Sequence, residues 1–63
     1  MQFAIKAYKQ QEFQDTFFGF AKELKMNPGM LTFHRDGEKV VAIVQDNVIE
    51  KLTDEQLAEL KTI

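Results

Sequence analysis

The sequence predicts an α+β fold, a single small domain with the element order β-α-β-β-α and a three-stranded antiparallel sheet. Three observations predict it: an alternating apolar pattern near residue 3, a helical apolar stripe after it, and two apolar runs that flank Asp36-Gly37. We expect one compact domain over residues 1–63, because the chain has only 63 residues. A domain of this size buries about 60% of the surface that its unfolded chain exposes, so we expect low stability.

The first strand and the first helix are predicted by a change in the spacing of apolar residues. Residues 2–8 alternate, with Phe3, Ile5 and Ala7 on one side, which predicts a half-buried strand. A helix over about residues 10–26 is predicted next by an apolar stripe at helical spacing, which consists of Phe13, Phe17, Phe20, Ala21 and Leu24. No good N-cap residue precedes this helix, and Asn27-Pro28-Gly29 predicts its end.

The segment from Met30 to Gln45 predicts a β-hairpin. Asp36-Gly37 between apolar runs is typical of a two-residue type I′ turn. That turn would pair Arg35 with Glu38, a favourable contact between opposite charges. The same register predicts the further pairs His34 with Lys39, Phe33 with Val40, Leu31 with Ala42, and Met30 with Ile43.

The last helix carries its own start signal. Thr53-Asp54-Glu55-Gln56 predicts a capping box, and Leu52 with Leu57 predicts a hydrophobic staple around it. Leu57, Leu60 and Ile63 are then expected to face the core. Before this helix, residues 47–51 predict one helical turn that buries Val48 or Ile49.

The run Val40 to Val44 is apolar on both sides, as in a central strand. We therefore expect the strand order 1-3-2, with the helices mainly on one face of the sheet. In this arrangement the first strand has an unpaired edge that another chain can join. The opposite face of the sheet would be open and mixed in polarity, with Ala4, Lys6, Tyr8, Thr32, His34, Lys39, Val41 and Ile43 on it.

Composition argues against several classes of protein. The chain has no cysteine and one histidine, which excludes disulfides and leaves no basis for a transition-metal cluster. The three glycines lie far apart and form no phosphate-binding loop, so we expect no cofactor. No residue pattern activates a nucleophile, and nothing orients His34 as a base, so we expect no enzyme. No apolar run reaches the ~20 residues of a membrane span, and we expect a small soluble, cytoplasmic protein without membrane partners.

Two positions in the first helix have alternative interpretations. Gly19 lies inside the helix, where glycine is less favourable than alanine by ~1 kcal/mol, so we expect a close approach of a neighbouring element there. Phe18 lies away from the apolar stripe, on a flank shared with Gln14, Lys22 and Lys25. Either the second helix covers Phe18, or Phe18 is an exposed anchor for a partner.

The sequence favours a non-enzymatic protein-binding module, which would serve as an adaptor, inhibitor or regulator. A protein partner, or a second copy in a homodimer, would contact the edge of the first strand, the open face or the Phe18 flank. One alternative is a small nucleic-acid-binding domain that uses the open face, which the net charge of −2 disfavours. Another is an inhibitor of a host protein of the kind that mobile elements carry. The predicted partner-binding residues are Lys6, Tyr8, Phe18, Lys22, Thr32, His34, Lys39, Val41 and Ile43.

Overall fold

The computed structural model describes residues 1–26 and 31–63. Its sheet contains β1 (Gln2–Lys6), β2 (Leu31–Asp36) and β3 (Lys39–Val44), in the order β1-β3-β2 with both pairings antiparallel. The predicted α+β fold and the central position of β3 are therefore confirmed. A short 3₁₀ turn, η1 (Ala7–Lys9), follows β1, and the helices are α1 (Gln10–Glu23), α2 (Asp46–Ile49) and α3 (Asp54–Lys61).

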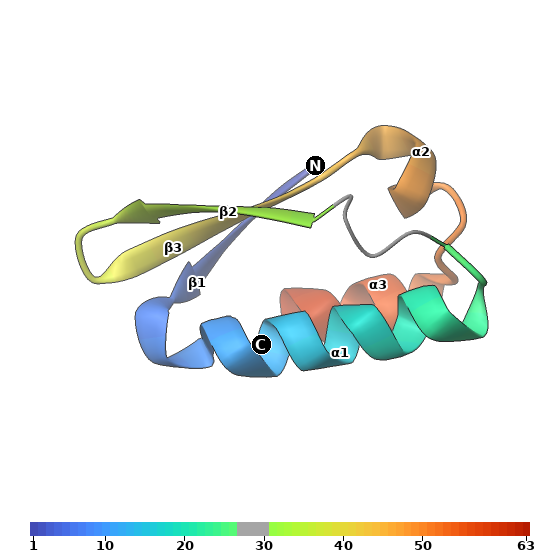
Figure 1. The fold of residues 1–63 in the computed structure, drawn as a ribbon, viewed down its shortest axis with the longest axis horizontal. Helices are drawn as coiled ribbons and strands as arrows, with labels where there is room; N and C mark the ends of the chain where they lie inside the picture. The colour runs from blue at the N-terminus through green and yellow to red at the C-terminus, as the bar shows by residue number, and fades with distance from the viewer. Residues whose placement is uncertain (27–30) are drawn as a thin grey trace.

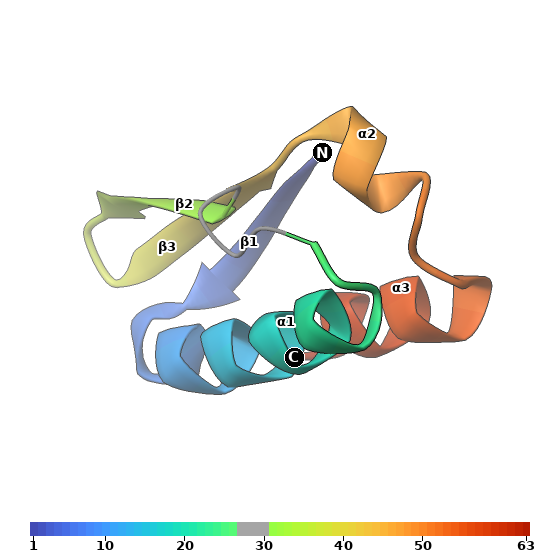
Figure 2. The same ribbon diagram turned by 45° about the vertical axis from the view of Figure 1, so that its right-hand side comes forward.

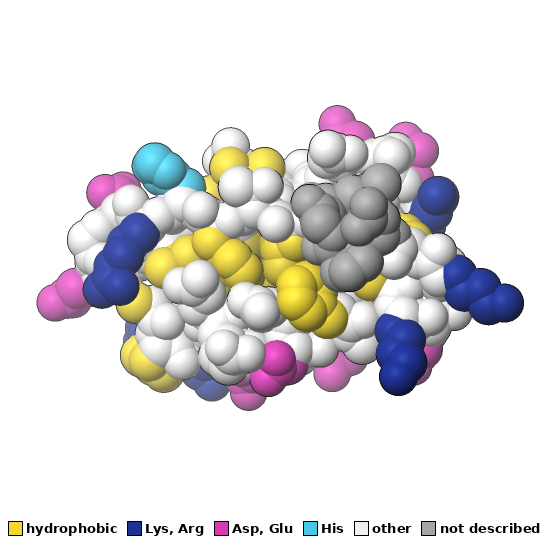
Figure 3. All heavy atoms as spheres, in the orientation of Figure 1, with side chains coloured by type: hydrophobic (Ala, Val, Ile, Leu, Met, Phe, Trp, Pro, Cys, Tyr) yellow, Lys and Arg dark blue, Asp and Glu magenta, His cyan; other side chains and the backbone are white. Residues whose placement is uncertain are grey.

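The molecule has two layers. Figure 1 shows the sheet above and the two longer helices, α1 and α3, side by side below it, whereas α2 caps the end of β3. Figure 2 shows the same arrangement after a turn of 45°, with both long helices still on one side of the sheet. On the side drawn in Figure 3, apolar side chains form a band between the two layers. The helices thus lie mainly on one face, as predicted.

Strand β1 is shorter than the alternating pattern predicts. It ends at Lys6, and Ala7 and Tyr8 belong to η1 instead of the strand. The physical reason is the length of its partner: β3 begins at Lys39, opposite Lys6, so beyond this pair only the hairpin turn remains. The Ala7 amide still donates a hydrogen bond of 3.0 Å to the Glu38 carbonyl in that turn.

Helix α1 packs through its phenylalanine stripe. Phe13, Phe17 and Ala21 are buried, whereas Phe20 and Leu24 are half-buried against the same cluster. The ring centroid of Phe13 lies 5.3 Å from that of Phe3 on β1 and 6.2 Å from that of Phe33 on β2. Its ring therefore contacts rings from both edge strands and anchors the helix across the sheet.

The end of α1 differs from the prediction. The helix stops at Glu23, and Lys25 adopts a φ of 56°. The Met26 amide donates to the Ala21 carbonyl at 2.8 Å and the Lys25 amide to the Lys22 carbonyl at 3.3 Å, the two bonds of a Schellman motif. A backbone motif with lysine in the usual glycine position thus ends the helix, and the predicted stop at Asn27-Pro28-Gly29 lies in residues outside the described ones.

The hairpin register also differs from the prediction. Asp36 pairs with Lys39, so the turn residues are Gly37 and Glu38 instead of Asp36 and Gly37. Gly37 has a φ of 65° whereas Glu38 has no positive φ, a combination typical of a type II′ turn. This turn needs the left-handed region only at glycine, whereas type I′ would also force Asp36 into it.

The new register changes partners but not faces, because every pair moves by two residues. Phe33 lies opposite Ala42, which places a large side chain beside a small one, and Leu31 lies opposite Val44. The predicted contact of Arg35 with Glu38 is wrong: the Arg35 Nε donates to the Gly37 carbonyl at 3.2 Å. The predicted partner Met30 lies outside the described residues.

The C-terminal elements follow their local signals. Val48 of α2 is buried, as are Leu52 before α3 and Leu60 within it. The Gln56 amide donates to the Thr53 hydroxyl at 3.1 Å and the Thr53 amide to the Gln56 Oε1 at 3.0 Å. Leu57 and Ile63 are half-buried against the core. The predicted capping box, the helical turn and the apolar face of α3 are confirmed.

Two expectations for α1 can be tested directly. The expected close approach at Gly19 is wrong, because a Cβ built there meets no neighbouring atom within 4 Å. Phe18 is half-buried against the core cluster, with its ring centroid 6.3 Å from that of Phe17.

In the described part of the chain, no helix has the length and apolar character needed to cross a membrane.

Candidate functional site

The face of the sheet that points away from the helices is the first candidate surface. We call it the open face and define it by three rows of paired residues: Gln2, Ile43 and Thr32; Ala4, Val41 and His34; Lys6, Lys39 and Asp36. The register places six predicted partner-binding residues here, namely Lys6, Thr32, His34, Lys39, Val41 and Ile43. Tyr8 does not belong to it, because the strand ends before this residue.

The centre of the open face is apolar. Val41 is half-buried and Ile43 has 37% of its surface exposed, and both belong to the central strand β3. The neighbour of Val41 in the same row on β1 is the small side chain of Ala4. Neither α1 nor α3 covers this face, since both lie on the other side of the sheet (Figures 1 and 2). Apolar area with a polar border is typical of interaction surfaces.

One end of the open face is strongly charged. Lys6 on β1 lies directly opposite Lys39 on β3, and like charges in that position destabilise a sheet. Asp36 lies opposite Lys39 on the other side. Among the described residues, neither lysine forms an ion pair within 4 Å. The two lysines therefore place positive charge at the end of β1 that no described carboxylate meets within 4 Å.

Tyr8 follows this charged row immediately and is the most exposed large apolar side chain of the described residues, at 73%. The Nζ atoms of Lys6 and Lys9 lie 5.8 Å and 5.9 Å from its ring centroid, within the range of cation–π contacts. The Lys9 Nζ also lies 3.2 Å from Glu12 Oε2. These contacts hold the ring beside the lysines while its surface faces solvent.

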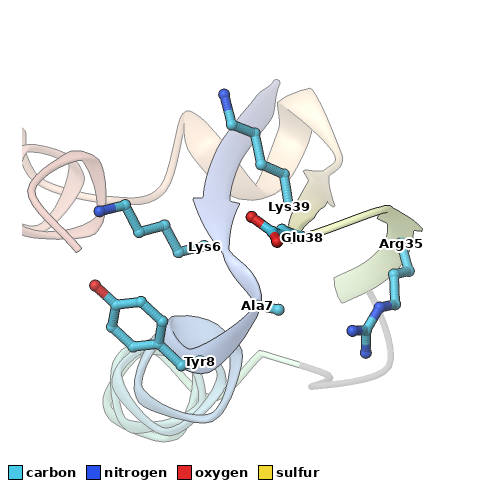
Figure 4. A pocket seen from close by; sticks show the side chains of 6 residues that line it. All are labelled: Lys6, Ala7, Tyr8, Arg35, Glu38 and Lys39. Carbon is cyan, nitrogen blue, oxygen red and sulfur yellow. The ribbon is translucent and has the colours of Figure 1, made fainter.

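A depression of about 510 Å³ opens where β1 ends beside the hairpin turn. We call it the basic groove and define it by its lining residues Lys6, Ala7, Tyr8, Arg35, Glu38 and Lys39. In Figure 4, Lys6 and Tyr8 project to one side of Ala7, and Arg35 lies on the other side. Three cations and one carboxylate therefore surround the groove.

Sequence reasoning missed part of this groove. Arg35 and Glu38 were expected to neutralise each other across the hairpin, whereas Arg35 lies opposite Val40 and binds the turn carbonyl. Ala7 was predicted to lie in a longer strand on the same side as Phe3 and Ile5; it packs against the core cluster, but from η1. The available signal was Gly37 itself, because a turn that uses positive φ only at glycine gives the observed register.

Two predicted residues lie elsewhere. Phe18 and Lys22 belong to α1, on the helical side of the sheet, and the structure does not bring them to the open face. Phe18 contributes to the core cluster, so it is not a fully exposed anchor. Lys22 is exposed and near the C-terminal end of its helix, where a cation is favourable.

His34 is an exposed side chain opposite Val41. Within residues 1–26 and 31–63 it makes no side-chain hydrogen bond and no ion pair, so no described acid orients its ring. No three acidic or histidine side chains of these residues come together in a way that holds a metal ion. What the described surface offers is apolar area, positive charge and one aromatic ring.

Strand β1 pairs with β3 on one side and with no strand of the described chain on the other. The Ala7 amide donates to the Glu38 carbonyl and the Val44 amide donates to the Met1 carbonyl. These two bonds show that the odd-numbered residues of this segment are the ones that bond to β3. In an antiparallel ladder every second residue points its amide and carbonyl outward. The outward groups of β1 are therefore those of Gln2, Ala4 and Lys6, whose side chains lie on the open face.

Comparison with protein-family models, with curated proteins and with solved structures finds no match to this chain.

Proposed function

We propose that this chain is a small protein-binding module, an adaptor, inhibitor or regulator, which contacts its partner through the open face and the edge of β1. The observation that carries the proposal is the uncovered apolar centre of the open face, where Ile43 is 37% exposed beside Val41. Polar and charged residues border this centre, as they do in many interfaces. The module acts by binding, without chemical change of its partner.

Three parts of the surface contribute different interactions. The centre at Val41 and Ile43 supplies apolar area that a partner buries. The outward backbone groups of β1 accept and donate hydrogen bonds to an added strand. The lysines at the end of β1 attract acidic groups and favour a correctly oriented encounter. We place the module in the cytoplasm, where a chain without cysteine loses no stabilising disulfide.

The nucleic-acid alternative has one observation in its favour, the exposed Tyr8 beside Lys6 and Lys9. Sheets that bind RNA stack bases on such rings, next to basic groups. Glu38 in the same groove and the net charge of −2 oppose it. A partner protein explains the apolar centre as well as the charged end, so we favour it.

The test uses affinity capture from the source cell with a matched pair of variants. Ile43→Glu puts a carboxylate in the apolar centre, and Ala58→Glu makes the same kind of change on the exposed side of α3. We expect wild type and Ala58→Glu to capture the same protein and Ile43→Glu to lose it. Circular dichroism of all three confirms that each is folded.

Native mass spectrometry of the purified chain decides whether the partner is a second copy. A dimer that Ile43→Glu dissociates and Ala58→Glu retains would make self-association the function of the open face. A monomer that captures no protein, or one whose capture is equal for both variants, would rule out the proposed surface.

A further inference from the structure

The basic groove contains an arrangement that lowers the stability of the fold. Lys6 and Lys39 are direct cross-strand neighbours, and Arg35 lines the same depression. Like charges at directly paired positions of a sheet are unfavourable, and although Asp36 is paired with Lys39 on the other side, no described carboxylate lies within 4 Å of either lysine Nζ. Arrangements that lower the stability of a fold, such as two paired lysines, are typical of functional sites. At such a site, a ligand of opposite charge can neutralise the lysines.

The groups around the groove are suited to an anion. The hydrogen bond of 3.2 Å from Arg35 Nε to the Gly37 carbonyl holds the guanidinium at the hairpin turn, and its terminal nitrogens make no hydrogen bond to the described residues. Lys6 projects on the far side of Ala7, so cations approach the groove from both sides (Figure 4). The exposed Tyr8 adds an aromatic face and a hydroxyl donor.

We propose that the basic groove binds a carboxylate-rich segment of a protein partner, which lies along the edge of β1. This inference rests on the proposed function and states the chemistry of the partner. A strand added to β1 bonds to the outward backbone groups of Gln2, Ala4 and Lys6. Its residue opposite Lys6 is Asp or Glu, because an opposite charge there is favourable and a cation there would be repelled by Lys6.

The observations favour an acidic peptide over a nucleic acid. The cations of the open face gather at one end, whereas the rows beyond it contain Thr32, Val41 and Ile43. A phosphodiester chain needs a track of positive charge and several stacking rings, and here one ring borders the groove. Glu38 would also repel closely spaced phosphates.

The test is a titration of the isotope-labelled chain followed by its backbone amide resonances. The probe is a capped ten-residue peptide of alternating Glu and Thr, which combines strand propensity with carboxylates on one face. The controls are the same peptide with Lys in place of Glu and a ten-residue oligothymidylate. We expect the acidic peptide to shift the resonances of Ala4 to Tyr8 and of Gly37 to Lys39, and to leave those of α3 in place.

A matched pair of double variants distinguishes the effect of the groove lysines on peptide binding from the effect of net charge. Lys6→Gln with Lys39→Gln removes two groove cations, and Lys51→Gln with Lys61→Gln removes two exposed lysines elsewhere. We expect the first pair to weaken peptide binding by about tenfold, as the loss of two ion pairs predicts. We expect the second pair to leave the affinity within about twofold, since it removes the same net charge from two lysines that do not line the groove.

Equal affinities of the two double variants would overturn the groove as the binding site. So would stronger binding of the oligothymidylate than of the acidic peptide, which would assign the groove to nucleic acid. If the groove variant still captures the cellular partner while Ile43→Glu loses it, the protein-binding function stands and only the acidic segment is wrong. If neither surface affects capture, both proposals fail.

Discussion

Helix α1 has no side-chain hydrogen bond at its N-cap, an exposed glycine in its middle and a lysine in the left-handed region after its end. Helix α3 begins instead with a complete capping box, directly after the buried Leu52. Yet α1 buries Phe13, Phe17 and Ala21, whereas α3 buries only Leu60 fully. The difference indicates that tertiary packing stabilises α1 despite poor local signals, and that local signals define α3.

The largest effect is expected at the core of α1. Phe17→Ala removes a side chain that is 1% exposed and should lower the free energy of unfolding by about 3–5 kcal/mol, because it leaves a cavity. A domain of this size has little more stability than that, so urea denaturation should find the variant largely unfolded. Phe20→Ala, at a half-buried position, should lose less. An equal loss at both positions would contradict the role of packing in α1.

The next effect concerns the start of α3. Thr53→Ala removes the hydroxyl that accepts from the Gln56 amide and should lower the free energy of unfolding by about 1 kcal/mol. Thr53→Ser keeps the hydroxyl and should stay close to wild type in the same denaturation experiment. If alanine were tolerated as well as serine, the capping box would not define this helix.

A substitution at the end of α1 should raise the stability of the fold. Lys25→Gly places glycine at a φ of 56° and should raise the free energy of unfolding by about 1 kcal/mol, since other residues are strained in this region. Lys22→Gly, the same substitution inside the helix, should lower it by about the same amount. The melting temperatures of the two variants should therefore shift in opposite directions from that of the wild type. A loss of stability in both would show that Lys25 makes contacts that offset its strain.

The smallest effect is expected in the middle of α1. Gly19→Ala should raise the free energy of unfolding by about 0.4–1 kcal/mol, because the new methyl group meets open space and alanine favours the helix. Gly37→Ala is the control, and it should lower stability because Gly37 has a φ of 65°. Chemical denaturation measures both. If Gly19→Ala lowered the free energy of unfolding, the low helix propensity of glycine at this position would not be what limits the stability of α1.

Much of this architecture is predictable from side-chain patterns. The apolar run from Val40 to Val44 predicts the central strand and hence the order β1-β3-β2, and Thr53 with Gln56 predicts the start of α3. In each case the responsible interaction is local or depends on burial alone. The open face follows from the same logic, because a shift of two residues in the hairpin leaves every side chain on its face.

The remaining features depend on backbone choices that the sequence leaves open. Asp36-Gly37 and Gly37-Glu38 can both form a two-residue turn, and the sequence favours the second only through the strain that a positive φ would place on Asp36. Lys25 adopts a conformation that lysine rarely takes, so residue type gives no signal for the end of α1. The basic groove combines residues about thirty positions apart and depends on the hairpin register.

The order of the strands also has a consequence for the time course of synthesis. Phe3 of β1 pairs with Ala42 of β3, so the earlier strand finds its partner only after nearly forty further residues have left the ribosome. The hairpin of β2 and β3 closes locally, and β1, which is distant along the chain, must then pair with the free edge of β3. Until that step, the apolar residues of β1 are accessible to chaperones, and nascent chains that stop before β3 lack a sheet.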